Sequence, residues 1–122
     1  MNVMVVDDEQ DITLLFKQKF RKEIKQKKLD FSFVFSAEDA LTSLQENDNH
    51  LILILADINM PGMNGLELLK IIKQEYPQIK VFMITAYGDE INYQTALEYG
   101  ADDYLTKPLQ FEHLKEKIHH LI

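Results

Sequence analysis

The 122-residue chain contains no cysteine. This absence excludes disulfide bonds, thiolate metal sites and cysteine nucleophiles, and it fits a reducing compartment. Any bound metal must therefore be held by oxygen or imidazole ligands.

Long apolar segments are missing as well. The longest apolar run, Leu51–Ala56, is far too short to cross a bilayer. The amino terminus leads directly into Val3–Val6 and two aspartates, without the basic and apolar regions of a signal peptide. We therefore expect a cytoplasmic protein that does not contact the membrane.

The chain has no excess of positive charge, because its formal net charge is −7. That charge argues against direct nucleic-acid binding by the domain as a whole. Seven of the thirteen basic residues nevertheless lie within residues 17–28. A solvated helix face is the favoured interpretation of this basic run, and a binding patch is the alternative.

Internal repeats, low-complexity tracts and Gly/Ser/Pro-rich linkers are also absent. The chain is 46% hydrophobic and 27% charged, which is typical of a folded globular protein. A length of 122 residues suits one domain. We therefore predict a single domain over residues 1–122.

Short apolar runs predict the strands of a buried sheet. Val3–Val6, Leu51–Ala56 and Val81–Ile84 lack polar alternation, as strands covered on both faces do. Phe31–Phe35 is half alternating and favours an edge strand, and Tyr104–Leu105 is a short fifth candidate.

The segments between these runs have apolar residues at helical spacing, which predicts a helix in each. Ser36 is predicted to cap the second helix, and Gly100 to end the fourth in a left-handed conformation. The apolar positions are Ile12, Leu15, Phe16, Phe20 and Ile24 in the first helix, Ala37, Ala40, Leu41 and Leu44 in the second, Leu66, Leu69 and Ile72 in the third, Ala96 and Leu97 in the fourth, and Phe111, Leu114, Ile118 and Leu121 in the fifth.

Five alternations of strand and helix predict an α/β fold, a doubly wound three-layer (βα)5 sandwich around a parallel five-stranded sheet. We expect the flavodoxin-like strand order 2-1-3-4-5. In such sheets ligands bind beyond the carboxyl ends of the strands, where the strand order reverses.

Polar residues follow the predicted strands at this edge. Asp7 and Asp8 follow the first strand, Asp57 the third and Thr85 the fourth, while Lys107 follows the fifth. Converging carboxylates repel one another, so they require a positive partner. A hard divalent cation with oxygen ligands, such as Mg²⁺, would supply it, together with Lys107.

Four motifs resemble the receiver domains of two-component signalling. They are VVDDE at 5–9, LADINMPGMNG at 55–65, ITA at 84–86 and GADDYLTKP at 100–108. Together they cover nearly the whole chain in the usual order. The chain is thus similar to the CheY-like receiver family.

This resemblance implies a role for each site residue. Asp57 would accept a phosphoryl group from a phosphohistidine, while Thr85 and Lys107 would contact its oxygens. Mg²⁺, or Mn²⁺, would be held by Asp7, Asp8, Asp57 and the backbone carbonyl of Asn59. The Lys107–Pro108 bond would be cis, and Asn59 and Tyr87 would flank the water that slowly hydrolyses the acyl phosphate.

The resemblance further implies a switch and its partners. Thr85 would move toward the phosphoryl group, and Tyr104 would turn inward behind it. The donor would be a sensor histidine kinase or a histidine phosphotransfer protein, and the downstream effector is not defined by the sequence. Whether phosphorylation leads to a homodimer is left open by the sequence. The chain would not be an enzyme beyond catalysing its own phosphorylation and slow dephosphorylation.

Three other functions compete with this one. An aspartyl phosphatase would need a general acid or base two residues after Asp57, where this chain has Asn59. A flavin-binding protein would need a phosphate loop after the first strand, where Asp7 and Asp8 repel phosphate. An interaction module that is not phosphorylated would not need the complete set of site residues.

Overall fold

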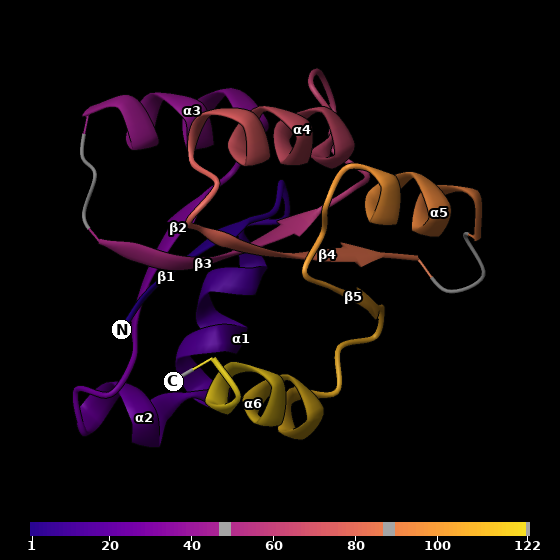
Figure 1. Cartoon of the computed structure of the whole chain (residues 1–122). Helices are drawn as coiled ribbons and strands as arrows, with labels where there is room; N and C mark the ends of the chain where they lie inside the picture. The colour runs from indigo at the N-terminus through magenta and orange to yellow at the C-terminus, as the bar shows by residue number, and fades with distance from the viewer. Residues whose placement is uncertain (47–49, 87–89, 122) are drawn as a thin grey trace.

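Five parallel strands form one sheet in the computed structural model, which describes residues 1–46, 50–86 and 90–121 (Figure 1). Its order, β2-β1-β3-β4-β5, is the predicted one. The strands are β1 (Asn2–Val6), β2 (Asp30–Val34), β3 (Leu51–Asp57), β4 (Lys80–Thr85) and β5 (Asp103–Thr106).

Helices cover both faces of this sheet, which gives the three predicted layers. α3 (Ala37–Glu46), α4 (Gly65–Glu75) and α5 (Glu90–Glu98) lie on one face, and α1 (Asp11–Lys19), α2 (Arg21–Lys25) and α6 (Phe111–His119) lie on the other (Figure 1). Among the described residues, no helix is long and apolar enough to span a membrane.

Two apolar cores follow from this layering, because side chains alternate between the faces of each strand. On β1, Met4 and Val6 pack beneath α3 and α4, whereas Val3 and Val5 pack beneath α1 and α6. β3 and β4 are buried along most of their length, as the continuous apolar runs predict. β2 is the half-buried edge strand.

The first predicted helix is divided into two, so the described residues form one helix more than the five predicted. Phe20 separates α1 from α2 with φ −105° and ψ 20°. Phe16 and Phe20 are nevertheless both fully buried, with ring centroids 5.7 Å apart. The apolar spacing therefore predicts the burial of Phe16 and Phe20 correctly and gives no sign of a change of backbone angles at one residue. Leu15, predicted to be part of that stripe, is 38% exposed.

The predicted helix signals at Ser36 and Gly100 are both present. Ser36 Oγ accepts a hydrogen bond from the backbone N–H of Asp39 at 3.0 Å. Gly100 follows α5 with φ +93°, the left-handed conformation that glycine adopts without strain. At the carboxyl end of the chain, Leu121 lies beyond α6, which ends at His119.

Candidate functional site

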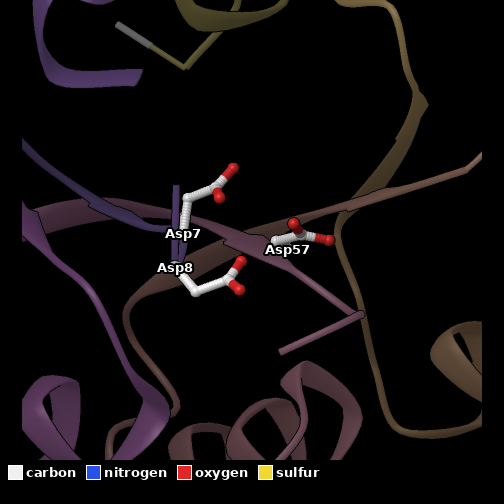
Figure 2. A group of neighbouring side chains, drawn as sticks. All are labelled: Asp7, Asp8 and Asp57. Atoms are coloured by element: carbon white, nitrogen blue, oxygen red, sulfur yellow. The ribbon is translucent and has the colours of Figure 1, made fainter. Parts of the chain in front are cut away.

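Three carboxylates meet at the carboxyl edge of the sheet. β1 leads into Asp7 and Asp8, and its neighbour β3 ends at Asp57. One oxygen from each of these aspartates lies within 4.8 Å of the others, and Figure 2 shows the side chains at the two neighbouring strand ends. The topology of the sheet thus brings together acids that are fifty residues apart in the sequence.

Asp57 is buried, with 3% of its surface exposed. Its Oδ1 accepts a hydrogen bond from the Asn59 backbone N–H at 3.1 Å, and its Oδ2 accepts one from Lys107 Nζ at 2.8 Å. Both carboxylate oxygens therefore have a donor, which compensates part of the cost of burying the charge and orients the group.

Asp7 is equally buried but is held differently. Its Oδ1 accepts a hydrogen bond from the Glu9 backbone N–H at 2.9 Å, and its Oδ2 lies 3.6 Å from Lys107 Nζ. Burial raises the pKa of the Asp7 carboxyl, and the nearby charge of Asp57 adds to this effect, whereas the Glu9 N–H and Lys107 oppose it. Asp8 is exposed at the mouth of the cluster.

Lys107 is the cation of this site. It lies just beyond β5 and is joined to Pro108 by a cis peptide bond. Burial alone would lower the pKa of the ammonium group, but the hydrogen bond to Asp57 and the charges of Asp57 and Asp7 outweigh burial and raise it. The site therefore holds a permanent positive charge beside Asp57.

Thr85 completes this edge of the sheet. It is the last residue of β4 and is fully buried, and its carbonyl accepts a hydrogen bond from the Lys107 backbone N–H at 2.8 Å. Its Oγ1 has no hydrogen-bond partner within the described ranges. A buried hydroxyl without a partner costs about 1–3 kcal/mol, so a ligand oxygen that accepted from it would recover stability.

Tyr104, the predicted switch residue, lies on β5. Its ring packs edge-to-face against that of Tyr93 on α5, with centroids 4.7 Å apart. The side chain is half-buried at the border of the core beneath α4. The Tyr104 side chain thus lies on the face of the sheet that α5 covers, and its strand leads to Lys107.

The contacts described so far do not test the roles predicted for Asn59 and Tyr87. The Asn59 backbone N–H orients Asp57, while the role of the Asn59 carbonyl as a metal ligand stays a prediction. Tyr87 lies outside the described residues. All four histidines, treated as surface residues on the basis of their spacing, are exposed: His50, His113, His119 and His120.

Gly65 has a structural role in the site that sequence reasoning did not assign. A Cβ atom at this position would lie 2.2 Å from the Asp57 carbonyl oxygen and 2.8 Å from Ile58 Cα. Its N–H donates to the Ile58 carbonyl at 3.0 Å. The Asn64–Gly65 dipeptide is a turn signal, but the close approach depends on a tertiary contact that a turn signal does not contain.

Comparison with known proteins identifies the family. Residues 3–119 match the response regulator receiver domain. The chain belongs to this family. Its relatives include the transcriptional regulatory protein CpxR of Escherichia coli K12, which is 36% identical over 116 residues, or 95% of this chain. This chain spans about half the length of CpxR, since the match covers 47% of that protein.

Solved structures of receiver domains agree with this fold. A receiver domain protein from Clostridium thermocellum has a TM-score of 0.87 at 28% identity, and the match covers 99% of this chain and 93% of the other. The response regulator TrrA of Thermotoga maritima, in complex with Mg²⁺-BeF, has a TM-score of 0.80 at 30% identity, with 99% and 98% covered.

The site of this receiver domain suits a hard divalent cation. All three clustered side chains are carboxylates, and the exposed Asp8 leaves one side of the cluster open to solvent. Oxygen ligands with room for water are what Mg²⁺ prefers. When bound, the cation would neutralise the acid cluster and the oxygens of an incoming phosphoryl group.

Proposed function

We propose that Asp57 accepts a phosphoryl group from a phosphohistidine on a sensor histidine kinase or histidine phosphotransfer protein. An O–P bond to the Asp57 carboxylate forms as the N–P bond to the imidazole breaks. The observation that supports this most directly is the position of Asp57, a buried carboxylate between two further acids and a lysine 2.8 Å away. Phosphoryl transfer requires an oriented oxygen nucleophile and neutralisation of the phosphoryl oxygens, and this arrangement supplies both.

The surrounding residues have complementary parts in the proposal. Asp7, Asp8, Asp57 and the Asn59 carbonyl hold Mg²⁺ or Mn²⁺. Lys107 neutralises one phosphoryl oxygen, and Thr85 Oγ1 donates a hydrogen bond to another. Because the Thr85 hydroxyl is buried without a partner among the described residues, the phosphorylated state would gain a hydrogen bond that the unphosphorylated state lacks. A ligand shifts a conformational equilibrium only through such a difference.

The switch follows from this gain. Movement of Thr85 toward the phosphoryl group opens space for Tyr104, whose ring leaves Tyr93 and turns inward. The surface formed by α5, β5 and α6 then changes shape and presents a different face to a downstream effector. The protein catalyses only its own phosphorylation and slow dephosphorylation.

Intact-mass spectrometry tests the proposal. With acetyl phosphate and Mg²⁺, we expect one phosphoryl group per chain, none in Asp57→Asn and normal labelling in Asp30→Asn, whose carboxylate is exposed on the far edge strand. Equal labelling of the Asp57→Asn protein would contradict the assignment. Many turnovers of a phosphomonoester would instead identify an aspartyl phosphatase, and partner binding by Asp57→Asn that no donor alters would indicate an interaction module.

A further inference from the structure

The basic residues of this protein divide into two groups according to their partners. Of the six outside residues 17–28, five lie within 4.0 Å of a carboxylate and Lys70 lies over the ring of Tyr99 at 5.4 Å. In the described part of the chain, none of the seven within that segment has a carboxylate at this distance, and all seven are exposed, although Lys19 lies over the ring of Phe111 at 6.0 Å. These seven are Lys17, Lys19, Arg21, Lys22, Lys25, Lys27 and Lys28.

Three of these cations line one hollow. They recur every fourth residue along α1 and α2, so they form a single row of like charges. Like charges at this spacing within one helix, as Arg21 and Lys25 are in α2, destabilise the helix by about 0.2–0.5 kcal/mol per pair. The hollow has a volume of about 310 Å³ and is lined by Lys17, Arg21 and Lys25, by the apolar side chains of Ile24, Phe31 and Phe33, and by one acid, Asp30.

The hollow lies away from the phosphorylation site. α1 begins close to Asp7 and Asp8, and α2 follows it and leads through Lys28 to Asp30 at the amino end of β2. The carboxyl ends of the parallel strands, with Asp57, are at the other end of the sheet (Figure 1). A partner bound here would not need to contact the phosphoryl group.

We propose that this hollow binds an acidic peptide segment of a partner protein that carries an aromatic or branched aliphatic side chain. The carboxylates would pair with the row of three cations and relieve their mutual repulsion. The apolar side chain would cover Ile24, Phe31 and Phe33, which are half-buried in the hollow. Such a partner matches both the charge and the apolar floor of the hollow.

Two other anionic partners match the hollow less well. A nucleic acid longer than the patch would meet the rest of a protein whose net charge is −7 despite these seven cations. A membrane surface would favour apolar side chains that project beyond the lysines, whereas the three apolar side chains here line a recess. A short acidic peptide ends where the cations end and can fill the recess.

Fluorescence anisotropy with a labelled peptide of about twelve residues tests the proposal. The probe is made of Glu and Asp with a central Phe-Leu pair, and its two controls replace the Phe-Leu pair by alanines or the acids by glutamines. We expect the probe to bind, with an affinity that falls as ionic strength rises, and each control peptide to bind at least about tenfold more weakly.

Matched triple variants locate the binding surface. Lys17→Gln, Arg21→Gln and Lys25→Gln together remove three charges from the hollow, whereas Lys19→Gln, Lys22→Gln and Lys27→Gln remove three charges beside it. We expect at least about tenfold weaker binding for the first set and less than about threefold for the second, with thermal midpoints that do not fall in either set. Asp57→Asn should bind the probe as the unaltered protein does.

Several results would overturn the proposal. Equal losses in the two triple variants would show diffuse attraction instead of a site. The same conclusion follows if the alanine control peptide binds as well as the probe. Tighter binding of a single-stranded oligonucleotide or of phosphatidylserine vesicles would assign the surface to a different class of partner. Labelling of the same protein samples with acetyl phosphate tests phosphorylation separately, so failure of peptide binding can be told apart from failure of phosphorylation.

Discussion

At the scale of single residues, burial of the Thr85 hydroxyl lowers the free energy of unfolding. It is fully buried without a partner in the described structure, and Thr13 Oγ1 shares that condition on α1. Replacing such a hydroxyl by a methyl group removes the desolvation cost while conserving shape. We expect Thr85→Val and Thr13→Val each to raise the free energy of unfolding by about 1 kcal/mol in urea titrations.

Function should separate these two variants. Thr85→Val removes the hydroxyl that we propose as a donor to the phosphoryl oxygens, so phosphorylation by acetyl phosphate should slow at least about tenfold. Thr13→Val should be phosphorylated at the normal rate. Equal rates in the two variants would remove Thr85 from the proposed mechanism.

Asp7 supplies a second prediction, whose sign follows from linkage. Its pKa is raised in the folded protein, chiefly by burial, above the ordinary value of 3.8. The folded state therefore binds this proton more tightly than the unfolded chain, and stability is lost as pH rises from the unfolded pKa through the folded pKa. Without Mg²⁺ at neutral pH, Asp7→Asn should raise the free energy of unfolding by on the order of 1 kcal/mol.

A pH series checks this explanation. The gain from Asp7→Asn should disappear below pH 3.8, where the carboxyl of the unaltered protein is protonated in both states. The hydrogen bond from the Glu9 N–H can be kept by the asparagine oxygen. Asp30→Asn, an exposed change, serves as the control. A gain that persists unchanged at acidic pH would contradict the electrostatic origin.

At the scale of secondary-structure elements, the start of α4 is packed onto the end of β3 through Gly65. A methyl group there would collide with the Asp57 carbonyl at 2.2 Å, and backbone on both sides would have to move. We expect Gly65→Ala to lower the free energy of unfolding by about 3 kcal/mol and to slow phosphorylation, because the displaced backbone carries Asp57.

Gly100→Ala is the matched control for this prediction. Gly100 has φ +93°, but a methyl group there would meet Lys73 Cγ at the ordinary distance of 3.6 Å. Only backbone strain remains, which costs about 1 kcal/mol. The two proteins are compared by urea denaturation and by labelling with acetyl phosphate. Normal labelling in Gly65→Ala would show that Asp57 tolerates movement of α4.

The strands and their order could be predicted from the sequence because each buried run is a local signal and parallel connections obey few topologies. The aspartates at the strand ends were predicted to be neighbours for the same reason. The break at Phe20 was not predicted, since a single residue can change its backbone angles without disturbing the apolar stripe. The hydrogen bonds of Asp57 and the packing at Gly65 depend on tertiary contacts that no local pattern specifies.

At the scale of the whole molecule, charge is distributed unevenly. Acids cluster at the carboxyl edge of the sheet around Asp57, and cations that have no carboxylate partner among the described residues gather along α1 and α2. Both groupings repel themselves and reduce stability, so each is expected to gain stability from a ligand of opposite charge. In the acid cluster, one oxygen from each of the three carboxylates lies within 4.8 Å of the others.

Thermal unfolding measures the gain at the acid cluster. A cation that binds only the folded state stabilises it by about 1.4 kcal/mol at ten times its Kd, which for a domain of this size raises the Tm by about 5 °C. We expect MgCl₂ to produce such a rise, and NaCl of equal ionic strength to produce a much smaller one. Asp8→Asn should lose the rise because it removes a proposed ligand, whereas Asp30→Asn should keep it. Equal shifts with both salts would mean that screening of the acids, and not a bound cation, stabilises the protein.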